Sequence, residues 1–295
     1  MSRIFHSIKK VIRKKLIITT RKRTNLFIIG EQKCGTTSLF QLLIRNPNIL
    51  PASIKECHYF NTDKIIHDKN YHNYHGLYRQ LAYKKYKYQL DASADYLTDE
   101  NSAEYTYTYN PGAKIIIMLR NPVARFISAY NFYFSNIVKE LDANYPVYFQ
   151  FSEKGKARYD YLKKNPGLTI EQFLEDELTG KSPLLGLSRG HYFEHIARWE
   201  KYFDKKNICV LNFENLISPI YAPAETGKLG RFLSLSLDTN FPKENISSLE
   251  TIVPADIIVK LENYFQFEIE QLRIMSERKN ENKLISKEYL DAYHF

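Results

Sequence analysis

The sequence predicts an α/β fold with a P-loop-like central parallel sheet flanked by helices. Four apolar runs of strand length alternate with stretches of helical periodicity, which is the pattern of parallel strands joined by crossover helices. Polar and charged residues follow each apolar run, as they do at the carboxyl ends of parallel strands where ligands bind. The chain has 295 residues, which is enough for one large domain of this class.

Periodicity and flanking residues place the individual elements. The predicted strands are the apolar runs Leu26–Ile29, Tyr86–Leu90, Lys114–Leu119 and Asn207–Phe213. The predicted helices, each with apolar residues at helical spacing, are Thr37–Arg45, Val123–Phe134, Thr169–Leu178 and Tyr192–Phe203. Thr169 and Gln172 have the spacing of a capping box, which predicts the start of the third helix.

The domain organisation follows from these elements. We expect one α/β domain over residues 25–270, preceded by a basic leader and followed by a helical tail over residues 271–295. Residues 135–167 are rich in Tyr, Lys and charge and have weak periodicity, so we interpret them as an insertion on the rim of the sheet. From Glu262 onward the chain has the pattern of one or two helices.

The basic surplus of the chain lies in its first residues. Residues 1–24 hold nine of the 42 Lys and Arg residues and none of the 33 acidic ones, so the remainder is neutral by count. A basic nucleic-acid-binding domain is therefore not expected, and neither is a nucleic-acid partner. Apolar and basic residues fall on opposite faces of a helix over residues 4–16, a pattern that suits peripheral contact with an anionic membrane.

Composition also bears on the compartment. The three cysteines form no Cys-x-x-Cys pair and no disulfide framework, which favours reduced thiols in a cytoplasmic protein. The leader lacks an uninterrupted apolar run of about 18 residues, so we do not expect it to cross a membrane. Two alternatives stay open for it, peripheral contact with the inner face of a membrane and a solvated or domain-packed helix.

The loop after the first predicted strand is the most informative motif. Gly30 and Gly35 have the spacing of a P-loop, and a helix begins directly after them, so backbone N–H groups and the helix dipole favour an anion there. Thr36 stands where a Walker A motif has lysine, and the lysine is instead Lys33, inside the loop. A sulfuryl group carries less negative charge than a phosphoryl group, so such a loop suits sulfuryl transfer without a metal.

A second anion-binding pair follows the third predicted strand. Arg120 ends that strand where an NTPase would have a carboxylate for its metal. Ser128 lies eight residues further on, two turns into the next helix, so both side chains can reach a second phosphate. Arg125 is a competing candidate for this role.

A third motif supplies a candidate base. Glu56 and His58 lie two residues apart beside Lys55, in a loop that runs into a short helix. A carboxylate in this setting can accept a proton from an acceptor hydroxyl or amine. His67, His72 and His75 invite a metal site, but no cysteine or acidic pair at ligand spacing accompanies them, so no metal is expected.

Two other classes of protein remain open on these residues alone. A P-loop kinase or NTPase would require Mg²⁺ and is disfavoured by Thr36 and Arg120. A non-catalytic module that binds membranes or nucleic acid would act through the basic leader and would lose its function without residues 1–24.

The motifs together resemble those of the PAPS-dependent sulfotransferases (PAPS is 3′-phosphoadenosine 5′-phosphosulfate), most of all bacterial relatives of the heparan-sulfate or carbohydrate branch. The resemblance runs from Asn25 to Asn263. It includes the 5′-phosphosulfate loop Gln32–Leu39, the 3′-phosphate motif Ile116–Tyr130 and the catalytic segment Lys55–Phe60. It implies the sulfotransferase fold and PAPS as the donor.

The resemblance also implies roles for individual residues. Glu56 is the expected general base, with Lys33 and His58 as further catalytic residues. The residues expected to bind PAPS are Lys33, Cys34, Gly35, Thr36, Thr37, Ser38, Arg120, Ser128 and Tyr192. Lys55 and Ser93 are expected to contact the acceptor.

Two departures from the heparan branch concern the acceptor. Ala92 replaces the lysine that precedes the serine after the second strand, and the Lys-Gly-Arg loop near the C-terminus is not visible. The sequence therefore predicts in-line, metal-free transfer of a sulfuryl group from PAPS to a hydroxyl, or less readily an amine, of a glycan or glycolipid, and it leaves the acceptor's identity open.

Overall fold

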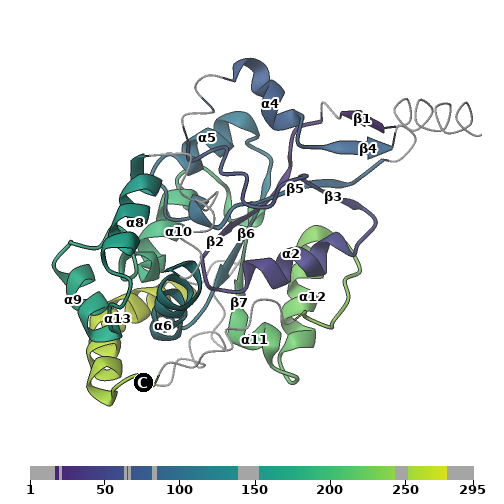
Figure 1. Ribbon diagram of the computed structural model, residues 1–295. Coiled ribbons are helices and arrows are strands. Elements are labelled where there is room, and N and C mark those ends of the chain that lie inside the picture. The colour runs from purple at the N-terminus through teal and green to yellow at the C-terminus, as the bar shows by residue number, and fades with distance from the viewer. Residues whose placement is uncertain are drawn as a thin grey trace, which may run out of the picture.

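A computed structural model of the chain describes residues 17–19, 22–62, 65, 68–81, 85–138, 153–242 and 252–277. Its centre is a five-stranded sheet, parallel throughout, as the sequence predicted (Figure 1). In spatial order the strands are β3 (Ile49–Pro51), β5 (Tyr88–Ala92), β2 (Leu26–Gly30), β6 (Lys114–Leu119) and β7 (Ile208–Asn212). The chain leads from β2 towards β3 and from β6 towards β7, so the loops diverge between β2 and β6. This is the point where open parallel sheets bind ligands.

The four predicted strands are confirmed, each within two residues at either end. The sequence analysis missed β3, because three residues ending in proline carry little strand signal. It also missed a small antiparallel sheet of β1 (Ile17–Thr19) and β4 (Arg79–Leu81). Since β1 pairs with β4, the end of the 1–24 leader belongs to the folded chain. The residues that define the amphipathic pattern, 1–16, lie outside the described part.

The four predicted helices are also confirmed. They are α2 (Thr36–Ile44), α6 (Pro122–Tyr130), α9 (Ile170–Leu178) and α10 (Tyr192–Glu200). The capping box is present, because the Thr169 hydroxyl accepts the N–H of Gln172 while the Gln172 side chain accepts the N–H of Thr169. The remaining α-helices of the described part are α4 (His72–His75), α5 (Ser102–Tyr109), α8 (Glu153–Lys164), α11 (Phe213–Ile217), α12 (Ala222–Leu233) and α13 (Ala255–Glu277).

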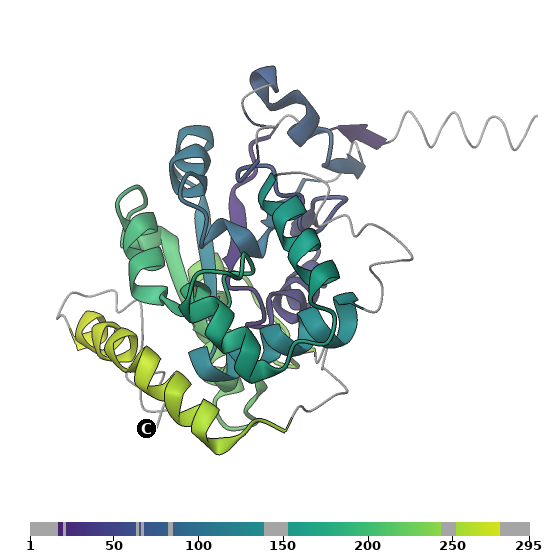
Figure 2. The ribbon, with the colours of Figure 1, turned by 60° about the vertical axis from the view of Figure 1, so that its left-hand side comes forward.

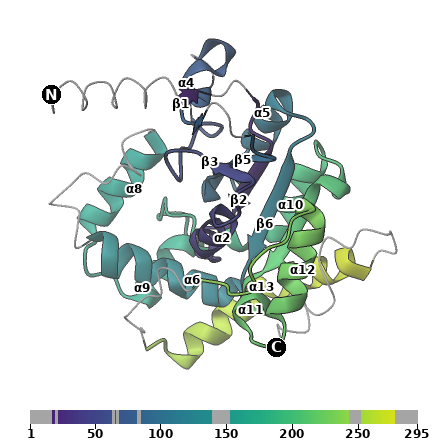
Figure 3. The same cartoon turned by 90° about the vertical axis from the view of Figure 1, so that its right-hand side faces the viewer.

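Successive residues of each central strand pack into different cores, because strand side chains alternate between the two faces of a sheet. Leu26 and Ile28 of β2 face α2 and α12. Phe27 and Ile29 face α5, α10 and the segment that holds Tyr59 and Phe60. Figure 1 shows α2 and α12 on one side of the sheet and α5 and α10 on the other, and Figure 3 shows α2 in front of the strands. The sheet is therefore a buried layer, and its polar loops lie at its ends.

A third core lies beside the sheet, where α6 packs against α9 and α13. Figure 2 shows α13 as the long yellow helix of this layer. It runs across the predicted boundary between residues 270 and 271 without a break, and residues 278–295 lie outside the described part. In the segment 135–167, predicted as a rim insertion, α8 buries Leu162 in the same core, so at least this part of it is packed.

A bilayer-spanning helix is absent from the described residues, because none of their helices combines enough length with enough apolar character.

Candidate active site

The loop between β2 and α2 forms a cradle for an anion. Gly35 is the N-cap of α2 and has a φ of 82°, a conformation that glycine adopts without strain. A Cβ at Gly35 would lie 2.5 Å from Cδ2 of Phe213, so glycine is also required by space. The N–H groups of Thr36 and Thr37, in the first turn of α2, have no carbonyl partner within the helix. Together with the helix dipole they attract negative charge. Cys34 and Ser38 lie in the same loop and turn and are buried.

The two cations that the sequence analysis singled out lie next to each other at this cradle. Arg120 follows β6 directly, and its Nη1 donates a hydrogen bond to the carbonyl of Lys33 at 3.3 Å. Burial, reinforced by the charge of Arg120, lowers the pKa of Lys33 to about 8. Both side chains are half-buried. The parallel pairing of β2 with β6 thus brings two positive charges from residues 87 positions apart to one edge of the sheet.

Tyr192 fixes the backbone at Arg120. Its side chain is fully buried at the start of α10, and its hydroxyl donates a hydrogen bond to the Arg120 carbonyl at 2.8 Å. The same hydroxyl lies 3.8 Å from Sγ of Cys34, whose pKa burial raises to about 12. Tyr192 therefore connects the β2–α2 loop to the residue that follows β6.

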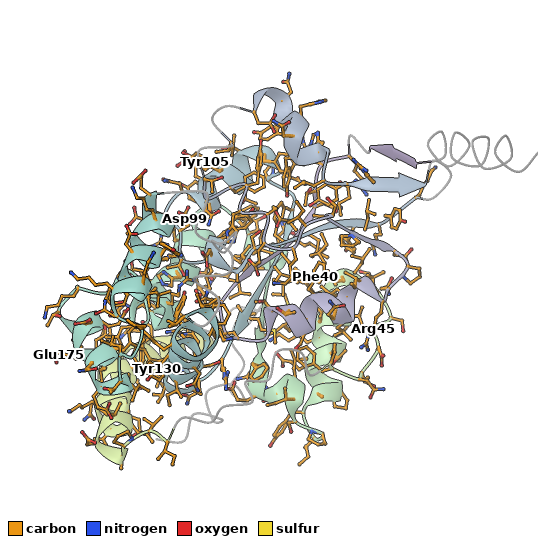
Figure 4. The ribbon with its side chains drawn as sticks, viewed as in Figure 1. Phe40, Arg45, Asp99, Tyr105, Tyr130 and Glu175 are labelled. Carbon is orange, nitrogen blue, oxygen red and sulfur yellow. The ribbon has the colours of Figure 1, made fainter. Side chains whose placement is uncertain are left out.

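The helix α6 holds the other two residues considered for the second phosphate. Ser128 is half-buried near the end of α6. Arg125 is fully buried, and its guanidinium donates a hydrogen bond to the carbonyl of Gly186. This competing candidate is therefore enclosed by the protein, and its positive charge acts on the buried Cys34 thiol of the cradle loop. In Figure 4, the label of Tyr130 marks α6, and the labels of Phe40 and Arg45 mark α2, the helix that follows the cradle loop.

The candidate base lies in the loop that follows β3 and contacts the Ala94–Tyr96 turn. Both Glu56 and His58 have positive φ angles, of 58° and 51°. Oε2 of Glu56 accepts the N–H of Ala94 at 2.8 Å and lies 4.0 Å from Nε2 of His58. The Lys55 ammonium pairs with Oε1 of the same carboxylate. Glu56, His58 and Lys55 thus form one polar group.

Gly30 allows this group to approach the anion cradle. A Cβ at Gly30 would lie 2.7 Å from the carbonyl oxygen of Ala94, whose N–H binds Glu56. The turn that carries Ala94 is therefore packed directly against the start of the cradle loop. A side chain at residue 30 would push the candidate base away from it.

A buried carboxylate, Asp91, holds the backbone of the catalytic segment. It accepts hydrogen bonds from Tyr74, Ser93, Cys57 and Tyr96, at 2.8, 2.9, 3.2 and 3.1 Å. In turn, the Tyr96 hydroxyl accepts the N–H of Tyr59 at 2.9 Å. Burial raises the pKa of Asp91, and the four donors oppose that shift.

Ser93 belongs to this network. The Ser93 side chain, which was predicted to contact the acceptor, is fully buried. Its hydroxyl donates a hydrogen bond to Asp91 and accepts one from the N–H of His58 at 3.4 Å. The structure therefore gives the Ser93 side chain a structural contact where the sequence analysis expected a contact with substrate.

An ion-pair network beneath the loop was not predicted. Arg189 is buried and donates to Glu31 and to Asp95, each at 2.7 Å, and Arg158 of α8 contacts the second oxygen of Asp95 at 3.4 Å. Burial opposes the charge of Asp95, but Arg189 and Arg158 hold its pKa below the usual range. Glu31 directly follows Gly30, so this network holds the backbone at the start of the cradle loop. The sequence analysis expected polar residues such as Glu31 and Asp95 after the strands, and the order Arg189-Gly-x-Tyr192 is part of the family resemblance, but neither predicted the ion pairs.

Two of the histidines considered for a metal, His72 and His75, lie on α4. His75 shares a hydrogen bond of 3.0 Å with the Tyr109 hydroxyl, and His67 lies outside the described residues. Among the residues that the structure describes, no three His, Cys, Asp or Glu side chains are grouped to hold a metal ion.

Comparison with known proteins identifies the family. Residues 23–275 match the sulfotransferase domain, which is most of the chain. The chain therefore belongs to the sulfotransferase family, whose members use PAPS as the sulfuryl donor. A crystal structure of a sulfotransferase from Alicyclobacillus acidocaldarius shares the fold, with a TM-score of 0.63, 23% identity, and coverage of 88% of this chain and 98% of that one.

Curated relatives are more distant. The chain is 27% identical to human heparan sulfate glucosamine 3-O-sulfotransferase 5 over 193 residues, which is 65% of this chain and 48% of the relative. It is 22% identical to human carbohydrate sulfotransferase 15 over 238 residues, which is 66% of this chain and 41% of the relative. The chain thus spans less than half the length of these two proteins.

The Asp91 network generates a prediction about stability. Asp91→Asn replaces one acceptor oxygen by an NH₂ group that faces hydroxyl donors, so a buried polar group loses its partner. We expect the free energy of unfolding to fall by about 1–3 kcal/mol, measured by denaturant titration. Asp238→Asn, at an exposed partner of Arg45, should change it by less than about 0.5 kcal/mol. Equal effects of the two substitutions would contradict the structural role of Asp91.

Proposed function

We propose that this protein is a sulfotransferase that moves a sulfuryl group from PAPS to a hydroxyl group of a glycan or glycolipid, and less readily to an amine. The observation that supports this most is the position of Lys33 inside the loop, beside Arg120 at the carboxyl ends of β2 and β6. A lysine in the loop and an arginine after the next strand suit a donor with a 5′-phosphosulfate and a separate 3′-phosphate.

In this proposal the cradle binds the 5′-phosphosulfate. Lys33 and the N–H groups from Gly35 to Thr37 neutralise its charge, while Cys34 and Ser38 pack behind them. Arg120 and Ser128 bind the 3′-phosphate, which distinguishes PAPS from ATP. Tyr192 holds Arg120 in position through its backbone carbonyl.

The chemical step breaks the bond between sulfur and the bridging oxygen of the donor while an acceptor oxygen bonds to sulfur. Glu56 takes the acceptor proton, and His58 orients that carboxylate from 4.0 Å away. The charge that builds on the leaving phosphate oxygen is stabilised by Lys33, which is protonated below a pH of about 8. No step in this scheme requires a metal ion.

The acceptor class is inferred from the names of relatives, which act on heparan sulfate and carbohydrate. Lys55 is the residue we assign to the acceptor side, because it lies beside Glu56 and is only half-buried. Transfer of radiolabelled sulfate from PAPS to a panel of polysaccharides and glycolipids identifies the acceptor.

Lys33→Ala tests the donor site. Removing one preorganised cation from the leaving oxygen should lower kcat by about 10²- to 10³-fold, measured as sulfate transfer from labelled PAPS. Lys205→Ala, at an exposed lysine that pairs with Glu200, is the matched control and should retain full activity. Near-normal transfer by Lys33→Ala would remove Lys33 from the mechanism.

Glu56→Gln tests the base. The amide keeps the shape of the side chain but cannot take a proton, so kcat should fall at least about 10²-fold, within the range expected for general bases. Affinity for PAP, the desulfated donor, should stay within about twofold, because Glu56 is assigned to the acceptor side. A matched drop in PAP affinity, measured by calorimetry, would instead make Glu56 a structural residue.

Ligand preference separates a sulfotransferase from a kinase. PAP should raise the thermal unfolding midpoint more than ATP with Mg²⁺ at equal concentration, because Arg120 has a 3′-phosphate to bind only in PAP. The measurement is a thermal-shift assay on the full chain. A larger shift with ATP and Mg²⁺ would favour the kinase alternative.

A further inference from the structure

The cradle contains two like charges, and each lies on the face of an aromatic ring. Nζ of Lys33 is 4.4 Å from the ring centroid of Phe132, and Cζ of Arg120 is 5.0 Å from that of Phe213. Arg120 and Lys33 repel each other, which contributes to the lowered pKa of Lys33. The negative face of an aromatic ring attracts a cation, most strongly where water is partly excluded.

The ring of Phe132 is positioned by an unusual backbone. The residues after α6, Asn131–Ile137, form a π-helix, a wider turn that often occurs at functional sites. The next residue, Tyr133, donates a hydrogen bond from its hydroxyl to Oε1 of Gln32 at 3.1 Å. Two successive residues of the π-helix therefore contact two successive residues of the cradle loop.

The ring of Phe213 is positioned from the other side of the site. Phe213 is the first residue of α11, directly after β7, and Asn212 caps that helix by accepting the N–H of Asn215 at 2.7 Å. The same ring occupies the space in which a Cβ of Gly35 would lie. Phe213 is thus wedged between the cradle loop and Arg120.

We propose that Phe132 and Phe213 are positioning residues that hold Lys33 and Arg120 apart while no anion lies between them, and that Phe132 also keeps Lys33 charged. An aliphatic side chain of similar size would exclude water from each cation but would not attract the cation. The rings do both, so the site is ready for an anionic donor before the donor arrives. This inference rests on the proposed function, because it assigns Lys33 and Arg120 to donor binding.

The first test measures the protonation of Lys33 without any donor. The full chain is treated with an amine-specific reagent across a range of pH, and labelling of Lys33 is followed by mass spectrometry. Phe132→Leu should move the labelling midpoint to lower pH by about 0.4 to 1.5, since the stabilising ring face is lost while the site stays apolar. The charged or titratable groups that act on Lys33 are Arg120 and Cys34, and both remain in place, as does Tyr133, which contacts the neighbouring Gln32.

Two variants serve as controls for this test. Phe132→Tyr keeps the ring face and should keep the midpoint. Phe134→Leu changes the same π-helix, but its ring packs on Tyr130 and Phe173, so the midpoint should also stay. An unchanged or higher midpoint in Phe132→Leu, or an equal shift in Phe134→Leu, overturns the role of Phe132.

The second test concerns Arg120. Phe213→Leu should weaken binding of PAP by about 2- to 30-fold, while binding of 5′-AMP, which lacks the 3′-phosphate, stays the same. Phe232→Leu is the matched control, because its ring lies 4.2 Å from Nζ of Lys114, a residue at the start of β6. Equal weakening of both nucleotides, as a purely structural role would give, or no weakening at all, overturns the role of Phe213.

The two proposals can fail separately. If Lys33→Ala retains sulfate transfer but Phe132→Leu shifts the labelling midpoint, the catalytic role of Lys33 is wrong and the ring contact stands. If Lys33→Ala abolishes transfer and the midpoint does not move, the proposed function stands and the positioning role is overturned.

Discussion

The parallel pairing of β2 with β6 is the constraint on which the site depends. Its register aligns Leu26 with Lys114 and Gly30 with Ile117, so both strands end at the same edge. The anion cradle follows one strand and Arg120 follows the other, and the hydrogen bond from Arg120 to the Lys33 carbonyl closes the gap between them. The connection after β2 leads to one side of the sheet and the connection after β6 leads to the other, and open parallel sheets bind ligands at such a point.

The buried polar side chains around this edge of the sheet form hydrogen bonds and ion pairs that fix the backbone of the loops. Asp91 fixes the catalytic segment through hydroxyl groups, and Arg189 fixes Glu31 beneath the cradle loop. Buried charges and hydroxyls are costly unless their hydrogen bonds are made, so such networks define one geometry well. Lys33, Glu56 and Arg120, to which the proposed function assigns donor binding and proton transfer, are by contrast half-buried.

The repulsion between the positive charges of Lys33 and Arg120 explains why aromatic rings lie beside them. An enzyme that transfers a sulfuryl group without a metal must gather positive charge in the protein itself, and that charge is repulsive until the donor binds. Aromatic faces offer a way to hold two cations without a carboxylate, which would compete with the donor. Partial burial has a further consequence, because it brings the pKa of Lys33 to about 8, close to neutral pH.

The sequence by itself determined four of the five strands of the sheet, the four predicted helices, and the positions of Lys33 and Arg120 after β2 and β6, because these depend on local periodicity and on residues next to a strand. Tertiary structure alone decided the short strand β3, the burial of Ser93 and Arg125, and the helix α8 in a segment with weak periodicity. It also decided the contacts of Phe132, Phe213 and Arg189. Glu31 and Arg189 are 158 residues apart, and no local pattern encodes a pairing that the packing of distant elements creates.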